Sequence, residues 1–240
     1  MAIQSTEFPE LSINEIEQRA ERLIDDYEDN VGRRVRAPVP VESIAEHYLG
    51  YEIEITNDGL FANPNYLGGI VFDENVIRIN ASVESHEGRY NFTVAHEIGH
   101  HVLHREYFLA HRNDNDPSIM CREVKEKPLV ERQADQFASA LLMPAELVRK
   151  AIESLPGVPT GDISVRALRV LASKVITAGQ FSNVSNTAMC NRLITLGYAR
   201  GMHYQTGKSI DFLRSSDNQG FSAVDRWLYK KLKKVLRLGR

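Results

Sequence analysis

The segment TVAHEIGHHVLH, Thr93–His104, constrains the fold most, because it holds four of the eight histidines of the chain in a stretch with helical periodicity. Residues four apart on a helix share one face, about one turn along. His96 and His100 of the HExxH motif can therefore present two imidazole nitrogens to one metal ion. Glu97 then lies beside the ion without binding it, where it can take a proton from water. The pattern predicts a helix that carries a metal ion and a catalytic base.

A catalytic zinc site usually has three protein ligands and an open fourth position. The extended motif HExxHxxGxxH is absent, because Leu103 and Glu106 stand where it needs Gly and His. We choose Glu131 as the third ligand, since it begins ERQADQF on a strongly periodic helix, 31 residues after the second histidine of the motif. Glu123 and Glu126 are weaker candidates, because no helical pattern fixes their direction.

Several side chains are expected around these ligands. Asp135 lies one turn past Glu131 on the same face, where it can accept the free ring N–H of a ligating histidine and fix its tautomer. His104 lies on the ligand side, and we favour core packing or support of a ligand for it over ligation. Tyr90 and Tyr107 are close to the motif in sequence, and either could polarise a substrate carbonyl.

Each of these residues also has a purely structural interpretation. HExxH occurs by chance in unrelated helices, and ERQADQF could be an exposed acidic face. His101 points off the ligand face, and His111 falls in what reads as a polar loop. The setting favours a metal site, because an apolar strand pair precedes the helix and Gly99 lets another backbone approach closely.

Hydrophobic periodicity predicts an α+β chain. The expected N-terminal domain has a small, mostly antiparallel sheet and an HExxH helix, and a helical C-terminal region follows it. The expected strands are 51–55, 67–72 and 76–82, and the expected helices are 12–29, 41–50, one from about 89, 128–143, 145–153, 162–178 and 186–196.

The loop LPGVPTGD, 155–162, is the clearest boundary in the chain. We expect a peptidase-like domain over 1–155, a helical region over 156–200 and a variable basic tail over 201–240. The helix pair in 156–200 could be helix-turn-helix-like. Its second helix carries Arg192 as its only basic residue, whereas DNA readers present several cations to phosphates. We therefore favour a structural or partner-docking role over nucleic-acid binding.

Composition sets further limits. No apolar run approaches the roughly 20 residues of a membrane span, so we expect no transmembrane segment. The N-terminus lacks the apolar segment of a secretory signal, and two cysteines without a CxxC pair fit the reducing cytoplasm. Residues 201–240 carry nine Lys/Arg against three Asp, and residues 226–240 carry seven without any acid. We favour a packed terminal helix with a solvated basic face there over a protein, nucleic-acid or membrane contact.

The chain resembles the ImmA/IrrE family of bacterial metallopeptidases over about residues 15–200. The resemblance rests on segments in a fixed order: PVPVESIAEHYLGYEIEI, RINAS, RYNFTVAHEIGHHVLH, ERQADQFASALLMP and FSNVSNTAMCNRLITLGYA. It implies a zincin-like fold for the N-terminal domain. It also implies a gluzincin-like site with His96, His100 and Glu131 as metal ligands and Glu97 as the base. Asp135 departs from the Asn commoner in the family, and residues after about 200 match nothing in it.

The resemblance also implies a cytoplasmic, metal-dependent peptidase that hydrolyses a specific protein, a helix-turn-helix transcriptional repressor, in a bacterial or mobile-element stress response. Zn²⁺ suits the ligands best, although Mn²⁺ and Fe²⁺ are compatible with nitrogen and oxygen donors. Two alternatives stay open: a regulatory DNA- or protein-binding module with a structural metal, and a toxin–antitoxin or phage component. The sequence does not indicate an oligomeric state.

Overall fold

A computed structural model describes residues 8–63, 65–111, 119–123, 129–158 and 164–199. The basic tail that we expect over 201–240 lies outside these residues. The helices are α1 (Ile13–Val31), α2 (Val41–Ser43) with a π-helical continuation (Ile44–Tyr48), α3 (Glu87–His111), α4 (Leu129–Leu142), α5 (Ala145–Glu153), α6 (Val165–Gly179) and α7 (Asn186–Thr195). The strands are β1 (Glu52–Thr56), β2 (Tyr66–Val71), β3 (Val76–Asn80) and β4 (Ile119–Glu123).

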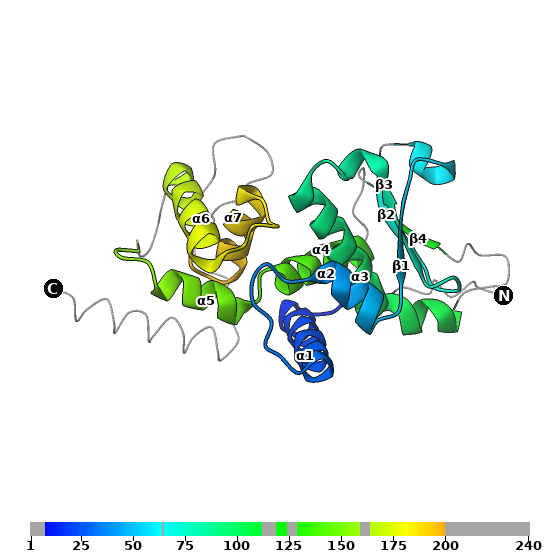
Figure 1. The fold of residues 1–240 in the computed structure, drawn as a ribbon, viewed down its shortest axis with the longest axis horizontal. Coiled ribbons are helices and arrows are strands. Elements are labelled where there is room, and N and C mark those ends of the chain that lie inside the picture. Colours follow the sequence, from blue (N-terminus) through cyan, green and yellow to red (C-terminus); the bar gives the residue numbers. More distant parts are fainter. Residues whose placement is uncertain (1–7, 64, 112–118, 124–128, 159–163, 200–240) are drawn as a thin grey trace.

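The described strands form one sheet in the order β1-β3-β2-β4. β2 pairs antiparallel with β3 and β4, whereas β1 runs parallel to β3. Figure 1 shows the sheet at one end of the molecule, α5, α6 and α7 at the other, and α3 and α4 between them. The α+β class and the mostly antiparallel sheet are confirmed. β4 is additional to the strands expected from sequence.

The first helix follows local rules closely. The Ser12 side chain accepts a hydrogen bond from the Glu15 backbone N–H, and the Glu15 carboxylate accepts one from the Ser12 backbone N–H. This capping box satisfies N–H groups that lack partners within the helix. Gly32 ends the helix in the left-handed conformation, with φ of 69°. The apolar stripe of α1 packs on α4, and its buried members are Ile16, Ala20, Leu23, Ile24 and Tyr27.

Two expected elements differ from their sequence predictions. The helix expected over 41–50 is a short α-helix that continues as a π-helix, because the Leu49 N–H donates to the Ile44 carbonyl, five residues back, at 2.9 Å. Helix α3, which carries the HExxH motif, extends further along the chain than its apolar face predicts. His111, expected in a polar loop, is its last residue. This correction arises because Val102, Phe108 and Leu109 keep the last turns packed against the core.

The C-terminal helices are joined to the rest of the fold by buried polar contacts. The Arg192 guanidinium on α7 donates to the Met143 carbonyl at 2.8 Å and pairs with the Glu17 carboxylate on α1. The Asn183 amide, in the turn before α7, donates to the Val39 carbonyl at 3.2 Å. These bonds satisfy buried donors across elements that are distant in sequence. These contacts agree with a structural role for α7. Its only basic side chain, Arg192, is buried against other elements of the fold.

Candidate metal site

The close crossing of α3 and α4 builds the site. A Cβ atom on Gly99 would lie 3.2 Å from both the Cα and the carbonyl oxygen of Ala134, so a larger residue would crowd the α4 backbone at this crossing. Ala134 follows Glu131 by about one turn of α4. The crossing therefore brings Glu131 against the face of α3 that carries His96 and His100.

Three ligand atoms converge at this crossing. His96 Nε2 lies 3.1 Å from His100 Nε2 and 3.1 Å from Glu131 Oε2, and His100 Nε2 lies 3.3 Å from Glu131 Oε1. Ligand atoms about 2.0 Å from a tetrahedral ion are roughly 3.3 Å apart, so the spacing fits a small divalent cation. All three side chains are buried. The donor set and its spacing are those of a group that could hold a metal ion.

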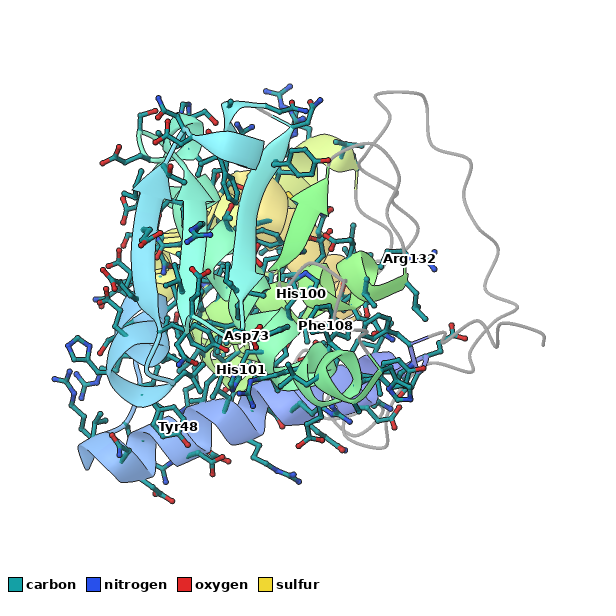
Figure 2. The ribbon with its side chains drawn as sticks, turned by 90° about the vertical axis from the view of Figure 1, so that its right-hand side faces the viewer. Tyr48, Asp73, His100, His101, Phe108 and Arg132 are labelled. Atoms are coloured by element: carbon teal, nitrogen blue, oxygen red, sulfur yellow. The ribbon has the colours of Figure 1, made fainter. Side chains whose placement is uncertain are left out.

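Burial and local partners favour the deprotonated forms that bind metal. Burial lowers the pKa of His100. Burial alone would raise the pKa of the Glu131 carboxyl, but hydrogen bonds with His100 and His96 outweigh it and hold that pKa well below its usual range. A neutral imidazole and a carboxylate are the ligating forms of these residues. Figure 2 shows His100 within the molecule, whereas Arg132, next to Glu131 in sequence, extends away from it.

Asp135 orients His96. Its Oδ1 lies 3.1 Å from His96 Nδ1. A carboxylate accepts here, so in its metal-binding form His96 carries its proton on Nδ1 and leaves the Nε2 lone pair for the ion. Glu131 and Asp135 thus lie one turn apart on α4, as expected. Asp135 contacts Nδ1 of His96, and Glu131 contacts Nε2 of the same ring.

Glu97 projects from α3 toward β2. Its side chain is fully buried. A Cβ atom on Gly68 would lie 2.8 Å from Glu97 Oε1 and 2.5 Å from Thr93 Cγ2. Strand β2 therefore has a glycine where it passes over the carboxylate. The pairing of β2 with β4 is irregular between Tyr66 and Gly69. Sequence analysis missed Gly68, although two glycines within a strand are typical of a bulge or a close backbone approach.

The two tyrosines proposed as carbonyl-polarising groups have different partners in the structure. The Tyr90 hydroxyl donates to Glu42 Oε1 on α2 at 2.7 Å. The Tyr107 ring stacks on the His111 ring, with centroids 4.0 Å apart. Tyr107 lies seven residues beyond His100 on the same helix. Seven residues of helix correspond to about 10 Å along the axis. A role for either tyrosine in catalysis stays a prediction.

The other histidines and glutamates considered from the sequence lie at different distances from the ligand group. His101 turns away from the ligands, and its Nδ1 lies 2.9 Å from the Tyr51 hydroxyl. Burial, with a smaller effect of nearby Arg105, lowers the pKa of His101 to about 4. His104 is buried behind His100, with 3.1 Å between their Nδ1 atoms. Glu123 is the last residue of β4, and Glu126 lies outside the described residues.

An HExxH helix, crossed by a second helix that supplies a glutamate, on an α+β fold defines the class of zincin-like metallopeptidases. Residues 40–158 match the family model described as the IrrE N-terminal-like domain, of peptidase family M78. The domain that they form belongs to the ImmA/IrrE family of metallopeptidases, which confirms the resemblance seen in the sequence. No curated protein matches the chain significantly. No helix within the described residues is long and apolar enough to cross a membrane.

Proposed function

We propose that the chain is a zinc-dependent cytoplasmic endopeptidase with one specific protein substrate, a helix-turn-helix repressor in a bacterial or mobile-element stress response. The observation that carries the peptidase proposal is the buried His96–His100–Glu131 group, with the Glu97 carboxylate on the next residue of the same helix. A structural zinc site usually has four protein ligands, and it has no use for a buried acid beside them. The repressor substrate rests on the family resemblance.

The residues have distinct roles in peptide hydrolysis. His96, His100 and Glu131 would hold a zinc ion, which would supply the Lewis acidity that acidifies water and polarises the scissile carbonyl. Glu97 takes the proton of the attacking water and returns it to the leaving amine. The glycine backbone of β2 over Glu97 restricts where this carboxylate can move. Asp135 holds the His96 ring in its ligating tautomer.

The donor set also bears on the metal. Two imidazoles and one carboxylate suit Zn²⁺ and leave a fourth position open for water or substrate. Mn²⁺ and Fe²⁺ accept the same donors, so the metal is part of the proposal. Metal analysis of the purified protein, followed by reloading with each ion and an activity measurement, tests this choice.

The decisive experiment is co-expression with the repressor-like protein encoded nearest to this gene. Intact-mass spectrometry would compare wild type with Glu97→Gln, which keeps the ligands, and with Glu146→Gln, an exposed acid on α5. A discrete cut with wild type and Glu146→Gln, and none with Glu97→Gln, is expected. Cleavage by Glu97→Gln would contradict the assigned base. Stable binding without cleavage by every form would favour a regulatory binding protein.

A further inference from the structure

A row of polar groups leads from His100 through the buried His104 and Gln133 to the Pro9 carbonyl, near the start of the described residues. We propose that Gln133 is a positioning residue for metal binding: held by the Pro9 carbonyl, it fixes the tautomer of His104, which fixes that of His100. The inference rests on the proposed metal site. It adds two residues, Gln133 and Pro9, that neither the HExxH motif nor the helical spacing singles out.

The first step is the orientation of the Gln133 amide. Gln133 Nε2 lies 3.1 Å from the Pro9 carbonyl oxygen. A carbonyl oxygen can only accept, so the NH₂ end of the amide must face Pro9. The Oε1 end then faces the opposite way, where it lies 2.9 Å from His104 Nε2. The backbone carbonyl therefore determines which end of the amide meets the histidine.

The second step is the tautomer of His104. The amide oxygen is an acceptor, so His104 Nε2 must carry the hydrogen. A neutral imidazole with Nε2–H has a bare Nδ1. That Nδ1 lies 3.1 Å from His100 Nδ1, which consequently donates to it. The proton of His100 is thus on Nδ1, and its Nε2 lone pair faces His96 and Glu131.

The same assignment follows from the metal end. A histidine that binds an ion through Nε2 keeps its proton on Nδ1 and needs an acceptor there. A doubly protonated His104 would offer His100 a donor instead and exclude this tautomer. His104 and Gln133 are buried, at 1% and 2% exposure, so water has little access to replace either partner. The Phe8 ring meets His104 edge-on, with centroids 5.6 Å apart, and helps to hold its plane.

The two histidine ligands are therefore supported by different chemistry. His96 donates to a carboxylate, Asp135, whereas His100 donates to a neutral imidazole backed by an amide. Polar groups behind a ligand raise its basicity and fix its ring, and their loss typically costs about 10–100-fold in metal affinity. The neutral partners orient His100 without adding another negative charge to those of Glu131, Glu97 and Asp135.

The test measures zinc affinity by competition with a chromophoric chelator, together with thermal unfolding of each metal-free protein. Gln133→Met keeps length but removes the acceptor, and should weaken Zn²⁺ binding about 10–100-fold. Gln133→Glu removes the donor to the Pro9 carbonyl and favours a doubly protonated His104, so it should weaken Zn²⁺ binding as well. Asn183→Leu is the matched control, because it removes another buried amide that donates to a backbone carbonyl, away from the ligands. It should leave Zn²⁺ affinity unchanged.

A second measurement needs no variant. Long-range ¹H–¹⁵N correlation spectra of histidine-labelled wild type distinguish the two tautomers directly. The proposal requires Nε2–H for His104 and, in the zinc-loaded protein, Nδ1–H for His100. An Nδ1–H tautomer at His104 would overturn it, as would wild-type affinity in Gln133→Met or an equal loss in Asn183→Leu. Wild-type protein that binds no Zn²⁺ would instead remove the metal site itself, and with it the proposed function.

Discussion

The Glu97 carboxylate lies directly over Gly68: its Oε1 atom is 2.8 Å from the position that a Cβ atom would occupy there. The two residues come from different layers, Glu97 from α3 and Gly68 from β2. No side chain larger than hydrogen fits without moving the carboxylate or Thr93. The proposed base is thus placed by the sheet as well as by its own helix.

Gly68→Ala should therefore reduce peptide cleavage while sparing metal binding. A displacement of about 1 Å at a catalytic group can cost about 100-fold in rate, whereas His96, His100 and Glu131 are not touched by the new methyl group. Cleavage rate and Zn²⁺ affinity would be measured on the same sample. Adding Thr93→Ala relieves the overlap with Cγ2 alone, so recovery of full activity in the double variant would argue against displacement of Glu97.

Gly99→Ala should loosen the crossing of α3 and α4. Alanine favours a helix over glycine by about 1 kcal/mol, but overpacking typically costs about 1–3 kcal/mol, and here the neighbour is Ala134 backbone, which cannot rotate away. We expect lower stability and weaker Zn²⁺ binding. Gly88→Ala on the same helix meets its nearest atom at 3.4 Å and should keep the helix-forming gain. Equal effects of the two substitutions in urea unfolding would contradict this explanation.

Asp135→Ala should weaken Zn²⁺ binding about 10–100-fold, because His96 loses the acceptor that fixes its tautomer. Asp135→Asn should cost far less, since an amide oxygen can still accept from His96 Nδ1. Chelator competition on the two variants compares them directly. A similar loss in both would indicate that the charge of Asp135 matters, rather than its hydrogen bond.

Arg192→Leu should lower the free energy of unfolding by about 3–5 kcal/mol, because it leaves the Glu17 carboxylate without its buried partner. Arg149, on α5, pairs with Glu146 and Glu153 near the surface. Arg149→Gln should change the same free energy by no more than about 1 kcal/mol. Urea unfolding measures both, and a small effect of Arg192→Leu would show that α7 contributes little to the stability of the domain.

Acid should destabilise the metal-free protein. The pKa of folded His101 is about 4, below the 6.5 of an ordinary histidine, so the unfolded chain binds more protons between these values. The free energy of unfolding must then fall as the pH is lowered from about 6.5 to 4. His101→Gln should reduce this dependence, which urea unfolding at several pH values in the presence of chelator would reveal. An unchanged slope would assign the effect to other groups.

Local rules predict much of this fold. The capping box at Ser12, the apolar stripe of α1 and the i, i+4 spacing of His96 and His100 depend only on neighbours in sequence, and the structure has all three. The direction of Glu131 follows from its helix in the same way. Its convergence with the histidines is expected from its place on a periodic helix and from the family resemblance, and Gly99 indicates a close backbone contact.

Other features depend on contacts that no local pattern encodes. β4 is a strand because β2 offers it an edge, and Ile119–Glu123 alone shows no alternation that marks it. Gln133 lies two residues from Glu131, on a different part of the α4 surface, so helical spacing does not connect it with the metal. Its role arises from the position of Pro9, 124 residues away in sequence.

The ligands also have a consequence for the topology of the chain. His100 and Glu131 are 31 residues apart, and a single ion shared by their helices closes that stretch into a loop, much as a disulfide would. Metal at 100 times its dissociation constant adds about 2.7 kcal/mol to the stability of the folded state. Zinc supply would then govern how long the protein survives cellular proteases, as well as whether it can cut.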